Sequence, residues 1–100
     1  MLENNVFLHL RRFYREIFYF RKNKECDLLV RERGGIKLCI QVTFELNNDK
    51  EREISGLLEA MEEVKLDEGL IVTYDQEDEF TLNRKRILVR PAWKWMLENF

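Results

Sequence analysis

The chain has 100 residues, of which 45% are hydrophobic and 36% are charged, and its net charge at pH 7 is -2. This composition predicts one soluble globular domain, excludes a disordered chain and gives no overall attraction to nucleic acid. No stretch reaches the roughly 20 apolar residues of a membrane span, and the first residues lack the pattern of a signal peptide. We therefore expect no membrane association and, by default, a cytoplasmic location.

The first half of the chain predicts a helix followed by three strands. Apolar residues at helical spacing predict the helix over residues 2–15. Runs rich in β-branched and aromatic residues then predict strands at 16–20, 26–33 and 36–46. A polar turn separates the first two strands, and Gly34-Gly35 predicts a tight hairpin between the second and the third.

The second half predicts a helix, two strands and a final helix. Asn48 and Glu51 have the spacing of a capping box, which predicts a helix running to about Leu66. The remaining expected elements are a strand at 70–74, an acidic loop at 75–79, a strand at 86–90 and a helix at 92–98. Trp93 and Trp95 lie two positions apart in this helix, so we expect one in the core and the other exposed at a partner surface.

The expected order is therefore α-β-β-β-α-β-β-α. The first three strands should form an antiparallel meander, because short turns connect them. Strands 36–46 and 70–74 flank a helix, so they should be parallel and joined by a right-handed crossover. The sequence predicts an α/β fold with a mixed sheet and helices on its faces.

Polar residues interrupt two of the apolar strands. Asp27 lies in one strand, and Gln41 and Thr43 share one face of the next, because side chains alternate along a strand. Burying an unpaired carboxylate costs several kcal/mol, so the presence of polar residues within apolar strands requires an explanation. Two interpretations are open: the residues form a metal site, or this face of the sheet is exposed to solvent.

The two cysteines and the single histidine favour structural roles. Cys26 and Cys39 have opposite parity relative to the polar face, so a disulfide between them is not expected, and we interpret both as small buried hydrophobic residues. The chain has no CxxC motif. His9 lies far away in the sequence, without a partner at the spacing of a zinc ligand.

The element order and the polar residues together resemble the restriction-endonuclease-like fold of the PD-(D/E)xK superfamily. A closer resemblance rests on Leu2 to Phe7, Tyr19-Phe20-Arg21 before Glu25-Cys26-Asp27, Ile40-Gln41-Val42, Arg52-Glu53-Ile54 and Pro91-Ala92-Trp93-Lys94-Trp95. In these motifs the chain is similar to a C-terminal domain of unknown function found on archaeal and bacterial AAA-type ATPases. The resemblance implies a single restriction-endonuclease-like domain over residues 1–100. The chain has no phosphate-binding loop, so ATP hydrolysis is not carried over.

The resemblance also implies an altered nuclease site. Asp27 matches the aspartate that holds Mg²⁺, and Glu3 matches an acidic position that often completes the metal site. Gln41 matches the acidic ligand of the third strand, and Thr43 stands where the lysine should be. Glutamine offers an oxygen without a charge, and threonine cannot replace an ammonium that stabilises charge at phosphate. A lysine from elsewhere could substitute, and the candidates are Lys22, Lys24 and Lys37.

Two functions from different classes follow. The first is an accessory module, for interaction or DNA association, with a nuclease-type fold and a degenerate site. The alternative is an active Mg²⁺-dependent DNA endonuclease with a relocated lysine. Three partners stay open: DNA, a second copy of this chain, and a separate ATPase. Basic residues that could cradle phosphates lie at 11–15, 21–24 and 84–86, although such runs are usually solvated faces.

Overall fold

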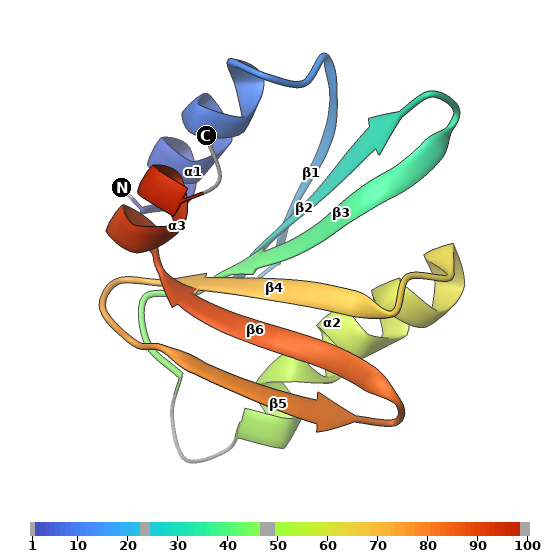
Figure 1. Ribbon diagram of the computed structural model, residues 1–100, viewed down its shortest axis with the longest axis vertical. Coiled ribbons are helices and arrows are strands. Elements are labelled where there is room, and N and C mark those ends of the chain that lie inside the picture. The colour runs from blue at the N-terminus through green and yellow to red at the C-terminus, as the bar shows by residue number, and fades with distance from the viewer. Residues whose placement is uncertain (1, 23–24, 47–49, 99–100) are drawn as a thin grey trace.

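The computed structural model describes residues 2–22, 25–46 and 50–98, but not the side chains of residues 3, 19–22, 25–27 and 50–53. The described part of the chain contains three helices and six strands (Figure 1). In chain order they are α1 Leu2–Arg11, β1 Glu16–Lys22, β2 Glu25–Glu32, β3 Gly35–Val42, α2 Lys50–Val64, β4 Glu68–Thr73, β5 Asp78–Leu82, β6 Lys85–Pro91 and α3 Ala92–Glu98.

The six strands form one mixed sheet with the order β1-β2-β3-β4-β6-β5. The first three strands pair antiparallel, which confirms the predicted meander. Strand β3 pairs parallel with β4 across the α2 connection, also as predicted, and β4 pairs parallel with β6. Strand β5 pairs antiparallel with β6 and forms one edge of the sheet.

Helices cover both faces of the sheet. Figure 1 shows α1 and α3 side by side on one face and α2 on the other. The α1–α3 cluster consists of Val6, Leu10, Leu28, Val30, Ile40, Val42, Val72, Ala92 and Trp95. The α2 cluster consists of Cys39, Leu46, Ile54, Leu57, Met61, Ile71, Ile87 and Val89. Neighbouring residues of one strand enter different clusters, because side chains alternate between the faces of a sheet.

Several elements end earlier than predicted. Helix α1 ends at Arg11 rather than at residue 15, because a closing turn follows in which the amides of Phe13 and Tyr14 both bond the carbonyl of Leu10. Strand β3 ends at Val42 rather than at Leu46. The predicted capping box at Asn48 and Glu51 lies outside the described residues and side chains.

The two hairpin turns that the structure describes, β2–β3 and β5–β6, use residues with positive φ. The β2–β3 turn is centred on Arg33 and Gly34, with φ of 55° and 84°, so it lies one position before the predicted Gly34-Gly35 pair. The β5–β6 turn uses Asn83 and Arg84, with φ of 51° and 65°. Two central residues with positive φ are the signature of the type I′ turn, whose twist matches that of the flanking strands.

Strand β5 is an element that the predicted order lacks. Its first two residues, Asp78 and Glu79, fell within the expected acidic loop. In the structure, Phe80 and Leu82 alternate along this strand and pack against the α2 cluster. The charged residues hide this alternation in the sequence, and charge on an edge strand is a common protection against unwanted pairing.

Helix α3 has the predicted range but buries a different side. The sequence pattern predicts that Trp93, Met96, Leu97 and Phe100 share one side of this helix, and Phe100 lies outside the described residues. In the structure the buried residues of α3 are Ala92 and Trp95, whereas Trp93 and Leu97 are exposed. The expectation that one tryptophan is buried and the other exposed is therefore confirmed.

Candidate functional site

Three parallel strands end at the same edge of the sheet. The register pairs Val42 of β3 with Val72 of β4, and Thr73 of β4 with Pro91 of β6. Ligands of open α/β sheets bind outside the carboxyl ends of parallel strands, where the connecting segments diverge. This edge is therefore the natural place to look for a site.

The backbone brings two of the predicted site residues together. Asp27 of β2 is the register partner of Gln41 of β3, which agrees with the predicted placement on neighbouring strands. Glu3 lies in helix α1. The side chains of Glu3 and Asp27 lie outside the described part of the structure, so their roles stay predictions.

Gln41 is buried, which contradicts a solvent-exposed face at this position. Its exposed fraction is 1%, and its register partner on β4 is Ile71, a member of the α2 cluster. The neighbours Ile40 and Val42 belong to the opposite cluster, so alternation directs Gln41 toward α2. An uncharged amide is far less costly to bury there than a carboxylate would be.

Thr43 follows β3 instead of lying within it. Its amide donates a hydrogen bond to the carbonyl of Val72 at 3.0 Å, which carries the pairing with β4 one residue past the end of the strand. Its hydroxyl lies 3.4 Å from the carbonyl of Glu45. Thr43 thus caps the end of the strand and brings no positive charge to it.

Of the three candidates for a relocated lysine, Lys37 has a described side chain. Lys37 pairs with Glu32 at 3.6 Å and lies over the ring of Tyr14. It precedes Gln41 by four residues, about 13 Å along a strand, so it does not reach Gln41. The side chains of Lys22 and Lys24 fall outside the description.

The described acidic, histidine and cysteine side chains form no metal-binding group. Among the described residues, no three His, Cys, Asp or Glu side chains come close enough to hold a metal ion. The side chains of Asp27 and Glu3 lie outside the described part of the structure, and Gln41 offers only an uncharged oxygen. Mg²⁺ held by Asp27, Glu3 and Gln41 therefore stays a prediction from the resemblance.

Gln76 joins the two segments that leave β3 and β4. Its Oε1 accepts from the amide of Leu46 at 2.6 Å, and its Nε2 donates to the carbonyl of Leu46 at 3.1 Å. Its own amide donates to the hydroxyl of Thr73 at 2.9 Å. Sequence reasoning missed this residue, because it lies in the expected acidic loop and no local pattern marks its partner 30 residues away.

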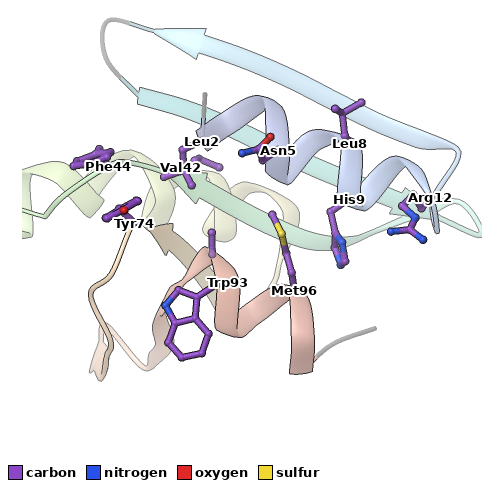
Figure 2. A pocket seen from close by; sticks show the side chains of 11 residues that line it. Leu2, Asn5, Leu8, His9, Arg12, Val42, Phe44, Tyr74, Trp93 and Met96 are labelled. Atoms are coloured by element: carbon purple, nitrogen blue, oxygen red, sulfur yellow. The ribbon is translucent and has the colours of Figure 1, made fainter.

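A large hollow of the described surface lies on the α1–α3 face, beside this edge. This α1–α3 groove has a volume of about 850 Å³. It is lined by Leu2, Asn5, Leu8, His9, Arg12, Val42, Phe44, Tyr74, Ala92, Trp93 and Met96 (Figure 2). Leu8, Phe44, Tyr74 and Trp93 are between 54% and 62% exposed, so the groove presents large apolar side chains to solvent.

The groove has chemically distinct ends. Figure 2 shows Phe44 and Tyr74 at one end and Arg12 at the other, with α1 running between them. The rings of Phe44 and Tyr74 stack with centroids 4.9 Å apart. At the other end, the ring of His9 contacts Trp95 edge-on at 5.4 Å. Burial, and secondarily the charge of Arg12, lower the pKa of His9 below its ordinary value.

The basic run at 84–86 is largely used inside the protein. Lys85 is buried, and its Nζ donates to the carbonyl of Leu66 at 3.0 Å. Arg86 pairs with Glu79 at 3.0 Å and with Glu68 at 3.3 Å. Within this run, Arg84 alone is exposed without these bonds, which weakens the run as a phosphate-binding surface.

The acidic connection between β4 and β5 is also partnered. Glu77 pairs with Lys94 of α3 and lies 3.8 Å from Arg90 of β6. The hydrogen bond from Lys94 lowers the pKa of Glu77, and the charges of Lys94 and Arg90 act in the same direction. These pairs tie the connection to α3, next to Trp93.

None of the helices in the described ranges is long and apolar enough to cross a bilayer. The mixed sheet, the three helices and the groove define a small α/β domain. By sequence, residues 1–95 match the family described as Domain of unknown function (DUF4143), and the chain belongs to that family. Comparison with curated proteins and with solved structures finds no significant match.

Proposed function

We propose that this domain is an accessory interaction module with a nuclease-like arrangement of strands and a degenerate active site. The observation that carries the proposal is the burial of Gln41, which the resemblance matches to a metal-binding acid. A two-carboxylate metal site needs charged oxygens facing the bound ion, and Gln41 has no charge to offer.

The chemistry of phosphodiester cleavage supports the same conclusion. A divalent ion ionises the attacking water, and a nearby cation stabilises the charge that develops at phosphate. Thr43 cannot supply that cation. Lys37 is paired with Glu32 and lies about 13 Å along the strand from Gln41. Removing one charge-stabilising group typically costs roughly 100- to 1,000-fold in rate.

The finer parts of this proposal come from the resemblance. They are a restriction-endonuclease-like core and descent from the C-terminal domain of AAA-type ATPases. The cytoplasmic location is a separate default expectation from the sequence. A separately encoded ATPase, DNA and a second copy of the chain are the partners to test. Membership of the DUF4143 family is compatible with an accessory domain of this kind.

The alternative is an active Mg²⁺-dependent DNA endonuclease. The observation in its favour is the register that sets Asp27 directly opposite Gln41, as the two motif strands of such an enzyme require. It needs a lysine supplied by Lys22 or Lys24, which lie at the hairpin next to Asp27 in sequence.

A cleavage assay separates the two functions. Supercoiled plasmid and branched DNA are incubated with the full chain in Mg²⁺ and, separately, in Mn²⁺. We expect the unmodified chain to cleave no faster than Asp27→Ala, because the charges that the reaction needs are missing. Asp75→Ala, which removes an exposed acid from the β4–β5 connection, is the matched control.

One outcome of this assay would favour the endonuclease. Cleavage that Asp27→Ala abolishes and Asp75→Ala leaves intact would establish the endonuclease and overturn the accessory role. Thermal unfolding of both variants, followed by circular dichroism, shows whether the loss comes from chemistry or from unfolding.

A further inference from the structure

We propose that the α1–α3 groove binds an amphipathic helix of a partner protein, with its apolar side chains along the groove and a carboxylate at Arg12. The inference rests on the interaction role proposed above and names the surface and the chemistry of the partner.

The first support is where exposed apolar residues gather. Seven large hydrophobic side chains are exposed in the described part of the chain. Four of them, Leu8, Phe44, Tyr74 and Trp93, line this one groove. Scattered apolar residues are ordinary on a protein surface, but a concave concentration of this kind marks an interaction site. Tryptophan and tyrosine are also the residue types that dominate binding energy at interfaces.

The shape of the groove favours a protein segment over a small molecule. A pocket for a small ligand encloses about 70–90% of its occupant, whereas these four lining side chains are more than half exposed. The groove follows α1 from Leu2 to Arg12, a span of about 15 Å for ten helical residues. An open trough of this length fits about three turns of a second helix.

The position of the groove in the sheet excludes strand addition. A partner strand needs an edge strand with an unpaired side, and the edge strands of this sheet are β1 and β5. The groove lies over β3 and β4, which are interior strands. Even past their ends the backbones are bonded, since the amide of Tyr74 donates to the carbonyl of Phe44 at 3.1 Å. Recognition must therefore occur through side chains, as in a helix that lies in a groove.

The charge of the groove defines one further contact. Arg12 is exposed at one end, and none of the described lining residues is a carboxylate. The other polar lining residues are Asn5 and His9, and His9 stays mostly neutral at pH 7 because its pKa is lowered. The positive charge at this end is thus that of Arg12, and an acidic residue of the partner complements it.

The test uses three synthetic peptides of about 18 residues, a length at which helices begin to be stable. The first carries leucines at i, i+3, i+4 and i+7 and glutamates at one end. The second replaces the glutamates by lysines, and the third keeps the first composition without helical spacing. Titration calorimetry with the full chain measures binding. We expect the acidic peptide to bind about 5-fold more tightly than the lysine peptide, and the third peptide not to bind.

Two variants of the protein locate the contact. Trp93→Ala should weaken the acidic peptide about 10-fold, because it removes a large aromatic anchor. Arg12→Glu should reverse the preference, so that the lysine peptide binds more tightly than the acidic one. The matched controls are Leu97→Ala, an exposed residue of α3 outside the groove lining, and Arg33→Glu in the distant β2–β3 turn. Both controls should leave affinity unchanged.

Several results would overturn the inference. One is that the acidic peptide does not bind at about 1 mM, a dissociation constant that corresponds to about -4 kcal/mol. Another is that Trp93→Ala leaves the affinity for the acidic peptide unchanged. A dimer in sedimentation that Trp93→Ala dissolves would assign the groove to a second copy. Binding of dodecanoate or of a proline-rich peptide in place of the helix would assign it to that ligand class. An Asp27-dependent nuclease would overturn the proposed function and leave this result standing, because the two assays share no variant.

Discussion

At the scale of single residues, polar groups in this domain are buried where they are uncharged or paired. Gln41 carries an amide among apolar side chains, and Lys85 reaches the carbonyl of Leu66. His9 is half-buried between Phe13 and Trp95, and its pKa is lowered because burial disfavours the imidazolium. The sequence marked Gln41 as unusual, but only its neighbours across the sheet show that it is buried.

The lowered pKa of His9 predicts a pH-dependent stability. As pH falls below the ordinary value of 6.5, the unfolded chain takes up a proton at this residue more readily than the folded chain. The free energy of unfolding should therefore decrease from pH 7.5 to pH 5.5. Urea unfolding at both pH values measures the decrease, and His9→Gln should reduce it.

The chosen pH range separates His9 from the carboxylates. Glu77 has a pKa below its ordinary 4.5, so its contribution is lost only at lower pH. An equal decrease in the parent chain and in His9→Gln would contradict the assignment to His9.

At the scale of elements, helix α2 packs on the sheet through a close approach at Gly69. A Cβ added at Gly69 would lie 2.4 Å from the Sδ of Met61 and 3.3 Å from the Cδ2 of Leu57. Met61 is fully buried, so its side chain has little room to move. The glycine at the start of β4 therefore sets how near α2 can lie.

Two glycines allow a matched comparison of this packing. Gly69→Ala should destabilise the domain by about 1–3 kcal/mol, because the added methyl forces α2 away from β4. Gly56→Ala lies within α2 and meets no described atom within 4 Å. It should stabilise the domain by about 0.5–1 kcal/mol through helix propensity. Urea unfolding measures both, and a stabilising Gly69→Ala would refute the close approach.

At the scale of the whole molecule, one sheet separates two clusters that must fold together. Ile40 on β3 belongs to the α1–α3 cluster, and Ile71 on the adjacent β4 belongs to the α2 cluster. Neither face can keep its strands in register without the other, so we expect a single cooperative transition. Small single domains of this size usually unfold in this way.

Substitutions on opposite faces test that cooperativity. Ile40→Val and Ile71→Val should each lower stability by about 0.5–1.5 kcal/mol. In a Trp93→Phe background, fluorescence reports Trp95 in the α1–α3 cluster, whereas far-ultraviolet circular dichroism reports the whole chain. Ile71→Val should shift both transitions equally. A fluorescence transition that stays in place would show that the two layers unfold separately.

Local pattern was sufficient for most of the elements. Periodicities of 3.6 and 2 residues identified the three helices and five of the six strands, and short turns implied the meander of β1 to β3. The placement of Asp27 and Gln41 on neighbouring strands was also predicted, whereas the register that sets them opposite each other comes from the structure. The predicted features depend on residues near one another in the chain, which is why they can be predicted without a structure.

Long-range contacts decided the rest. The burial of Gln41, the early end of β3 before Thr43 and the edge strand β5 each depend on which neighbour covers a segment. The α1–α3 groove assembles residues from positions 2 to 96, and no local pattern joins them. The sequence by itself determined the order of most elements and the unusual polar residues. Only the tertiary structure decided which surfaces are covered, because covering a surface depends on segments that are distant in the chain.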